Sequence, residues 1–325
     1  MNRIYSLATY LRQRFGGRLR KIPLDAASGC PNRDGSVSFH GCAFCNAQGS
    51  GTGMAANGLS LTRQWERLAS RTAHGQAGES VQQSFIAYLQ SFSNTYGPAA
   101  RLAGLMREIR ALPGLAAVSV GTRPDCLDQE KLAILAGTGI PETWLDIGLQ
   151  SSDDATLARI GRGHDFACFA SAVEQADALG LKVCAHVMAG LPGEGETEFL
   201  TTVRAVSALP ARGIKFHNLL VLRGTAMEAM WRAGKYSPLT PSCYVSMLCR
   251  ALADTRPDMV VHRLQADPAP GELVAPDWAG DKNVLLARIR EELAARDLWQ
   301  GRMAGAPESI PSWFDPAHDL PPSLQ

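Results

Sequence analysis

Short apolar runs alternate along the chain with longer segments whose apolar residues recur every three or four positions. The short runs are rich in Val, Ile, Leu and Phe and end in glycine or polar residues, as buried parallel strands do. They predict strands over residues 20–26, 83–89, 116–121, 143–149, 182–189 and 215–221.

The segments between these runs predict amphipathic helices. One of them places Leu102, Leu105 and Ile109 on a single face, and Asp128 and Asp153 are suited to cap two others. Strands and helices in regular alternation imply a parallel sheet with right-handed crossovers. We therefore expect an α/β fold, a partial (β/α)6 barrel resembling a TIM barrel but two strands short of closure.

The pattern changes beyond about residue 237. It predicts a helix over residues 243–254, a strand over 259–264, a proline-rich stretch over 268–276 and a last helix over 282–299. We divide the chain into a basic arm (1–19), the partial barrel (20–236), a C-terminal helix–strand–helix extension (237–304) and a flexible tail (305–325), rich in Pro, Ser and Asp.

Charge is nearly balanced, at +1 over the whole chain, so overall charge alone does not attract nucleic acid. The first 24 residues differ, because they contain basic residues and no acid: Arg3, Arg12, Arg14, Arg18, Arg20 and Lys21. This arm is consistent with a solvated helix face or a surface for phosphates, for instance of RNA. A transit peptide is less consistent, because a core strand is predicted to start at residue 20.

Eight cysteines are too few for a disulfide scaffold in a chain of 325 residues, and no secretory signal precedes them. We therefore expect a cytoplasmic protein whose clustered cysteines bind metal or do redox chemistry. No apolar run reaches the roughly 18 residues of a membrane span.

Three cysteines follow the first predicted strand in a C-x11-C-x2-C pattern: Cys30, Cys42 and Cys45. The C-x2-C turn can hold one metal centre, and Gly35 and Gly41 allow the loop to fold back so that Cys30 joins it. Three thiolates leave one metal coordination position open for chemistry, whereas a structural zinc site is closed by four ligands.

Three residues near these cysteines help to distinguish the kinds of metal centre that the loop could bind. We expect Phe39 and Phe44 to shield a metal centre from water. His40 is the candidate fourth ligand of the alternative, a structural Cys3His zinc site.

The cysteine loop and the strand ends together resemble the radical S-adenosylmethionine (SAM) superfamily. The usual spacing there is C-x3-C-x2-C, and the longer first gap is similar to the branch that includes the catalytic subunit of Elongator. The chain resembles YhcC-type proteins in eight short motifs: CPNRDG (30–35), SNTY (93–96), GTRPDC (121–126), GLQS (148–151), RGHD (162–165), GLPGE (190–194), IKFH (214–217) and HRL (262–264).

The resemblance implies an enzyme with two cofactors, a 4Fe–4S cluster and SAM. Cys30, Cys42 and Cys45 would bind three irons, and SAM would chelate the fourth. An electron from the reduced cluster would cleave SAM to a 5′-deoxyadenosyl radical that removes a hydrogen atom from the substrate. A flavodoxin- or ferredoxin-like partner would supply the electron.

The resemblance also implies SAM contacts at the strand ends. The implied residues are Gln90 and Asn94 for the methionine amino group, Gln150 for the ribose or carboxylate, Arg162 for the methionine carboxylate, Gly190 and Gly193 for the adenosyl group, and Val221 and Leu222 for adenine. A tight strand-to-helix turn is the alternative interpretation of GLPGE. No catalytic side chain is implied.

Relatives with the long cysteine gap often act on transfer RNA at wobble uridines, so tRNA is the expected substrate and partner. Two other functions remain open. One is a barrel metallohydrolase with His164, Asp165, His186 and His217 as ligands of a metal that activates water. The other is a non-catalytic RNA-binding module stabilised by zinc.

Overall fold

The computed structural model describes residues 3–47, 49, 53–73, 84–305 and 313. The strands are β1 (Arg20–Leu24), β2 (Phe85–Leu89), β3 (Leu115–Thr122), β4 (Thr143–Gln150), β5 (Lys182–Ala189), β6 (Gly213–Asn218), β7 (Val221–Leu222), β8 (Val260–Arg263) and β9 (Leu273–Ala275). The α-helices are α1 (Leu7–Phe15), α2 (Leu61–Ala73), α3 (Ala99–Arg110), α4 (Gln129–Ala136), α5 (Asp154–Arg159), α6 (Phe166–Ala178), α7 (Glu196–Ala208), α8 (Ala226–Arg232), α9 (Pro241–Asp254) and α10 (Lys282–Ala295). Two 3₁₀ turns, η1 (Pro124–Cys126) and η2 (Asp277–Gly280), complete the set.

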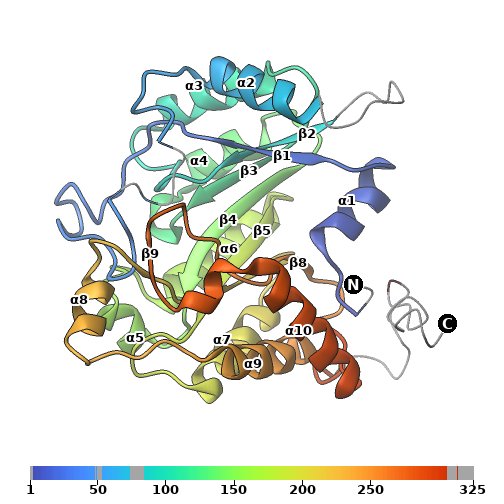
Figure 1. Cartoon of the computed structure of the whole chain (residues 1–325). Helices are drawn as coiled ribbons and strands as arrows, with labels where there is room; N and C mark the ends of the chain where they lie inside the picture. Colours follow the sequence, from blue (N-terminus) through green and yellow to red (C-terminus); the bar gives the residue numbers. More distant parts are fainter. Residues whose placement is uncertain (1–2, 48, 50–52, 74–83, 306–312, 314–325) are drawn as a thin grey trace.

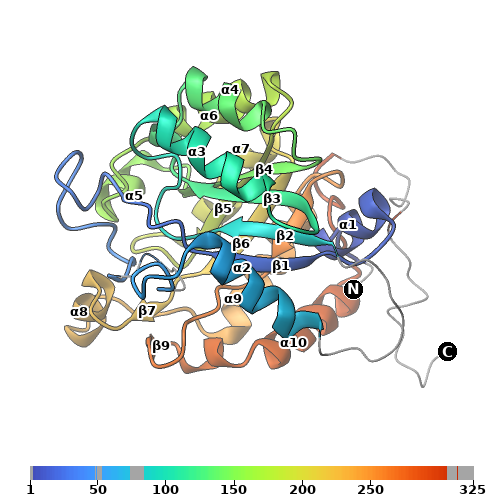
Figure 2. The ribbon, with the colours of Figure 1, turned by 90° about the horizontal axis from the view of Figure 1, so that it is seen from above.

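Seven of these strands form one parallel sheet in the order β1-β2-β3-β4-β5-β6-β8 (Figures 1 and 2). The prediction of an α/β partial barrel is confirmed, but the count of six strands is wrong. β8, expected in the C-terminal extension, pairs with β6 through Gly213 and Val260. The connection from β6 to β8 contains β7, α8 and α9. Because these elements break the regular alternation of strand and helix, the sequence pattern did not assign β8 to the barrel.

Residues alternate between the two faces of the strands. On β4, Leu145, Ile147 and Leu149 pack into the apolar core, while Asp146 and Gly148 line the barrel interior. The helices cover the outer face, as Figure 2 shows for α3, α4 and α6. The two predicted helix caps are confirmed, since carboxylates at positions 128 and 153 accept hydrogen bonds from the first turns of α4 and α5.

Helix α1 covers the end of the sheet where the strands begin. Leu11 packs against Ile86 and Ala117, at the starts of β2 and β3, and Tyr10 lies 5.7 Å from the ring of Trp144 at the start of β4. The cysteine loop and α8 lie at the opposite end (Figure 1). The basic arm is therefore separated from the mouth of the barrel by the length of a strand, roughly 25 Å for eight residues.

The C-terminal segment packs beside the barrel. The last helix ends at Ala295 rather than at the predicted residue 299, and β9 pairs antiparallel with β7 near the mouth. The predicted tail, apart from residues 305 and 313, and residue 83 of the predicted second strand lie outside the described residues. None of the described helices is long and apolar enough to cross a membrane.

Candidate functional site

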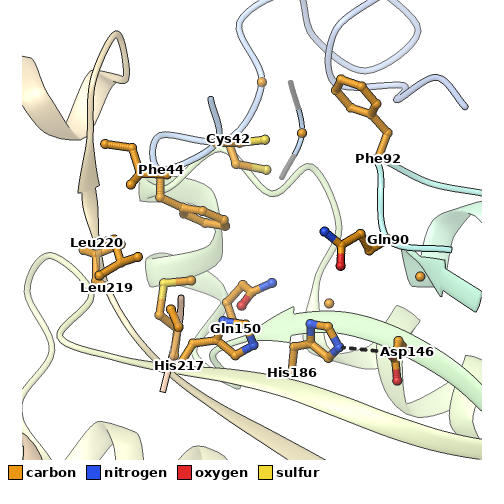
Figure 3. Close-up of a pocket in the computed structure, with 18 of the residues that line it drawn as sticks. Cys42, Phe44, Gln90, Phe92, Asp146, Gln150, His186, His217, Leu219 and Leu220 are labelled. Carbon is orange, nitrogen blue, oxygen red and sulfur yellow. Dashed lines mark ion pairs between the residues drawn. The ribbon is translucent and has the colours of Figure 1, made fainter. Parts of the chain in front are cut away.

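A cavity of about 460 Å³ opens at the mouth of the barrel, where the strands end. All three cysteines of the loop line it: Cys30, Cys42 and Cys45. Figure 3 shows Cys42 and Phe44 on one side of this space, with Gln90, Gln150 and His217 facing it from the strands. The strand ends thus bring the cysteine loop and four of the eight expected SAM residues to one cavity, as in other β/α barrels.

The cysteine loop is held in its folded-back form by its own backbone. Gly35 and Gly41 have positive φ angles of 90° and 72°, which favour glycine. The amide of Gly41 donates to the carbonyl of Asn32 at 2.7 Å, and the amide of Cys45 donates to the carbonyl of Cys42 at 3.0 Å. The first bond closes the long gap between Cys30 and Cys42, and the second fixes the C-x2-C turn itself.

The donor set of the loop fits a cluster better than a single zinc ion. Zinc would draw its ligand atoms to within about 4 Å of one another, given Zn–S bonds of about 2.3 Å. Among the described residues, the cysteine sulfurs are not a group of atoms within 4.8 Å of one another. Because each thiolate of a cluster binds a different iron, wider spacing suits it. His40, the candidate zinc ligand, is exposed and lies outside the cavity lining.

Positive charge surrounds the loop cysteines. Arg33, Arg123 and Arg162 all line the cavity, and Arg162 Nη1 donates to Cys42 Sγ at 3.2 Å. Burial opposes ionisation of Cys42, but the charge and hydrogen bond of Arg162 outweigh it and lower the pKa of this thiol. Burial raises the pKa of the Cys45 thiol. Guanidinium groups cannot lose their protons here, so they favour the thiolates that iron requires.

The two loop phenylalanines differ in their surroundings. Phe44 lines the cavity and can exclude water from the cysteines. Phe39 is 74% exposed, so the expectation that it shields the metal centre is wrong. Its ring packs over Gly35, where a Cβ atom would lie only 2.4 Å from it, so glycine is needed at this position.

Four of the expected SAM residues line the cavity, namely Gln90, Gln150, Arg162 and Leu222. Gln150 has a φ of 88°, a left-handed conformation that costs a non-glycine residue energy. Strain of this kind persists only where the surrounding structure fixes it, and it is concentrated at functional sites.

The other four expected SAM residues lie outside the cavity lining. The amide of Asn94 is used in the turn after β2, where it donates to three backbone carbonyls and accepts from Ser28. Gly190 and Gly193 have φ angles of 84° and 83° in a turn packed against side chains of Leu239 and Arg159, which fits the tight-turn interpretation.

Val221 is fully buried in the core, one residue before Leu222 at the cavity. Direct SAM contacts stay predictions for all eight residues, including the four that line the cavity.

The metallohydrolase ligands do not converge. Asp165 caps α6 by accepting from the amide of Cys168, and the Nδ1 atom of His164 meets the Asp165 carbonyl. His186 and His217 stack on each other deep in the barrel, with ring centroids 5.3 Å apart. In the part of the chain that the structure describes, these four residues do not form a group of ligand atoms within 4.8 Å.

The floor of the cavity is a polar layer built around an ion pair that the sequence motifs did not identify. Asp146 on β4 forms an ion pair with Lys215 on β6, and these side chains are 0% and 2% exposed. Lys215 Nζ also donates to Tyr88 Oη at 3.2 Å, and His186 Nε2 lies 3.9 Å from Asp146 Oδ2. The sequence did contain an indication of this layer. The polar residues at positions 146, 186, 215 and 217 each follow an apolar residue that packs into the core on the other face of the strand.

Burial favours the neutral form of both floor histidines. Burial, and then the charge of Lys215, lowers the pKa of His186 to about 4. Burial lowers the pKa of His217 well below its ordinary value, and the neighbouring His186 adds to this effect. Each histidine has a buried Nε2 atom without a hydrogen-bond partner among the described residues. Such atoms are costly unless a ligand or water completes them.

The fold and the cysteine loop define a class, and the family comparisons identify it. Residues 28–206 match the family model of the radical SAM superfamily, and residues 211–295 match the radical SAM C-terminal domain. The chain belongs to the radical SAM superfamily. It is therefore an enzyme of the class that uses a 4Fe–4S cluster and SAM and needs an electron donor.

Particular relatives span most of the chain. It is 35% identical over 301 residues to the uncharacterized protein YtqA of Bacillus subtilis, covering 92% of each chain. It is 32% identical over 309 residues to protein YhcC of Escherichia coli, covering 94% of this chain and 95% of that protein.

Similarity to Elongator proteins is more partial. Human Elongator complex protein 3 is 30% identical over 186 residues, which are 56% of this chain and 34% of that protein. The structure of archaeal Methanocaldococcus infernus Elp3 superimposes with a TM-score of 0.66 at 15% identity. That match covers 87% of this chain and 64% of the archaeal chain, and at this identity it supports the fold alone.

Proposed function

We propose that this radical SAM enzyme remodels the side chain of a modified base in transfer RNA, at a wobble uridine. The observation that carries the proposal is the 30% identity to human Elongator complex protein 3 over 186 residues. The long first gap between the cysteines of this chain, by which the sequence resembles the Elongator branch, supports it. The uncharacterized relatives that match along the whole chain are consistent with the class and specify no substrate.

The chain's own residues divide the cavity into two parts. Cys30, Cys42 and Cys45 would hold the cluster at the mouth, and Gln90 and Gln150 would hold SAM beneath it. When bound, these cofactors supply an electron and a carbon radical for hydrogen abstraction, a chemistry that no amino-acid side chain provides. The residues position SAM and exclude water around it.

The floor of the cavity supports a polar substrate group. The Nε2 atoms of His186 and His217 have no hydrogen-bond partner among the described residues, and they lie in a buried layer beside the ion pair of Asp146 and Lys215. An apolar substrate would leave these groups without hydrogen bonds, at a cost of about 1–3 kcal/mol each. A nucleobase side chain with N–H or carbonyl groups meets this requirement.

The basic arm would bind the RNA backbone away from the cavity. Arg12 and Arg18 are exposed at the end of the barrel opposite the mouth, and Arg14 lies 3.6 Å from Glu142. Phosphate contacts there would add affinity without reading sequence. A tRNA bound in this way would extend along the outside of the barrel and place one base in the cavity.

The proposal is tested by comparing the modified nucleosides of tRNA from cells with and without this protein. We expect one wobble-uridine derivative to disappear and its precursor to accumulate. Adding anaerobic protein, SAM and a reductant to the precursor tRNA should then form the product together with 5′-deoxyadenosine. An unchanged nucleoside profile would overturn the tRNA substrate and leave the radical SAM assignment intact.

A further inference from the structure

Arg162 and Asn32 both direct hydrogen-bond donors at one sulfur of the cysteine loop. Arg162 Nη1 lies 3.2 Å from Cys42 Sγ, and Asn32 Nδ2 lies 3.4 Å from the same sulfur. All three side chains are buried. We propose that Arg162, assisted by Asn32, raises the reduction potential of the cluster by binding the Cys42 thiolate. This inference requires the cluster but not the tRNA substrate.

The physical reason is the change of charge on reduction. The reduced cluster carries one more electron, part of which resides on the cysteine sulfurs, so a donor to sulfur stabilises the reduced form more than the oxidised one. Hydrogen bonds to sulfur and nearby charge are established determinants of cluster potentials. A guanidinium supplies both, and burial keeps solvent from screening it.

The structure holds Arg162 in this position from several sides. Its Nη2 donates to the carbonyl of Gly148, and its own carbonyl accepts from Arg123 Nη2 at 2.7 Å and from Asn32 Nδ2 at 3.1 Å. A Cβ atom at Gly148 would lie 3.0 Å from Arg162 Nη2, so glycine leaves the space that this side chain needs.

The remaining nitrogen of the guanidinium allows a second contact. Arg162 Nε is buried and has no hydrogen-bond partner among the described residues. The contact with the SAM carboxylate that the family resemblance implies would use this nitrogen, while Nη1 stays on Cys42. In this arrangement Nη1 acts on the cluster through the Cys42 thiolate, and Nε stays available to SAM.

The test is a potentiometric titration of the reconstituted, anaerobic full-length protein, followed by the EPR signal of the reduced cluster. Arg162→Met removes donor and charge, and Arg162→Lys keeps the charge. Arg159→Met is the control, because Arg159 is exposed and donates to the carbonyl of Pro192. We expect reduction of the Arg162→Met cluster to be about tenfold less favourable, a potential about 59 mV more negative.

The Lys variant should fall between wild type and Arg162→Met, and Arg159→Met should match wild type. Unchanged potentials in both Arg162 variants would overturn the inference, as would an equal shift in Arg159→Met. If the variants do not retain a cluster, the inference is tested instead on wild-type protein labelled with ¹⁵N-arginine. Its reduced cluster should show a weak ¹⁵N coupling in pulsed EPR, and absence of this coupling would also overturn the inference.

These outcomes are separable from those of the proposed function. A shifted potential in a protein that leaves tRNA unchanged would retain the role of Arg162 and remove only the substrate. Wild-type protein that assembles no iron–sulfur cluster would overturn both.

Discussion

Replacing Lys215 by Met should destabilise the protein strongly, because it leaves Asp146 buried without its partner. The two side chains are 2% and 0% exposed, and Asp146 Oδ1 already lacks a hydrogen-bond partner among the described residues. Removing one member of a buried ion pair typically costs about 3–5 kcal/mol, which is a large part of the stability of one domain. The removed ammonium also donates to Tyr88, so the phenol loses a partner as well.

The assay is urea unfolding of the cluster-free protein under reducing conditions, followed by circular dichroism. Lys131→Met is the matched control, since Lys131 pairs at the surface with a 54% exposed Asp128, and it should cost less than about 1 kcal/mol. The double variant Asp146→Leu, Lys215→Met should be more stable than Lys215→Met alone, because no charge stays buried. A Lys215→Met protein within about 1 kcal/mol of wild type would refute the reasoning.

The same pair predicts how stability depends on pH. Burial alone would raise the pKa of Asp146, but the charge of Lys215 outweighs it and holds that pKa well below its usual range. Burial acts to lower the pKa of Lys215, but Asp146 outweighs it, so the pKa is raised. The pair's contribution is therefore complete between about pH 4 and about pH 10. It should be lost as pH falls further, through the folded pKa of Asp146, or rises further, through that of Lys215.

Three more predictions concern the site and its substrate. Gly148→Ala should shift the cluster potential in the negative direction, like the Arg162 variants, because the new methyl group displaces Arg162 Nη2; potentiometry checks this. Arg12→Ala with Arg18→Ala should weaken tRNA binding and reduce its salt dependence by about one unit of slope for each phosphate that the arm no longer neutralises, measured by binding at several salt concentrations. His217→Phe keeps the stacked ring but removes its nitrogens, so tRNA-dependent product formation should fall about 10- to 100-fold while cluster content stays at the wild-type level.

Much of the architecture could be predicted because the hydrophobic pattern of each short segment favours the same helix or strand that the fold contains. Each buried strand is an apolar run, and Asp128 and Asp153 stand where the helices begin. The seventh strand was predicted as a strand but not as part of the barrel. Pairing between β6 and β8 depends on the path of the chain through two intervening helices, which a local pattern does not encode.

The site was predicted in part for the same reason. The meeting of the cysteine loop and the strand ends at one cavity follows from the rule that strand ends lie at one edge, whereas the roles expected of the strand-end glutamines come from the family resemblance. Arg162 was expected near SAM, but its bond to Cys42 joins residues 120 positions apart. The ion pair of Asp146 and Lys215 likewise joins strands two places apart in the sheet, and only the curvature of the barrel brings them together.

The central claim is that three thiolates hold a cluster with one iron left for SAM. EPR of the anaerobically reconstituted and reduced protein, recorded with and without SAM, tests it most directly. We expect about four irons per chain, a reduced-cluster signal whose g-values change when SAM binds, and loss of that signal in Cys45→Ala. A colourless protein with one bound zinc would contradict the presence of the cluster. A cluster signal that does not change when SAM is added would contradict an iron left open for SAM.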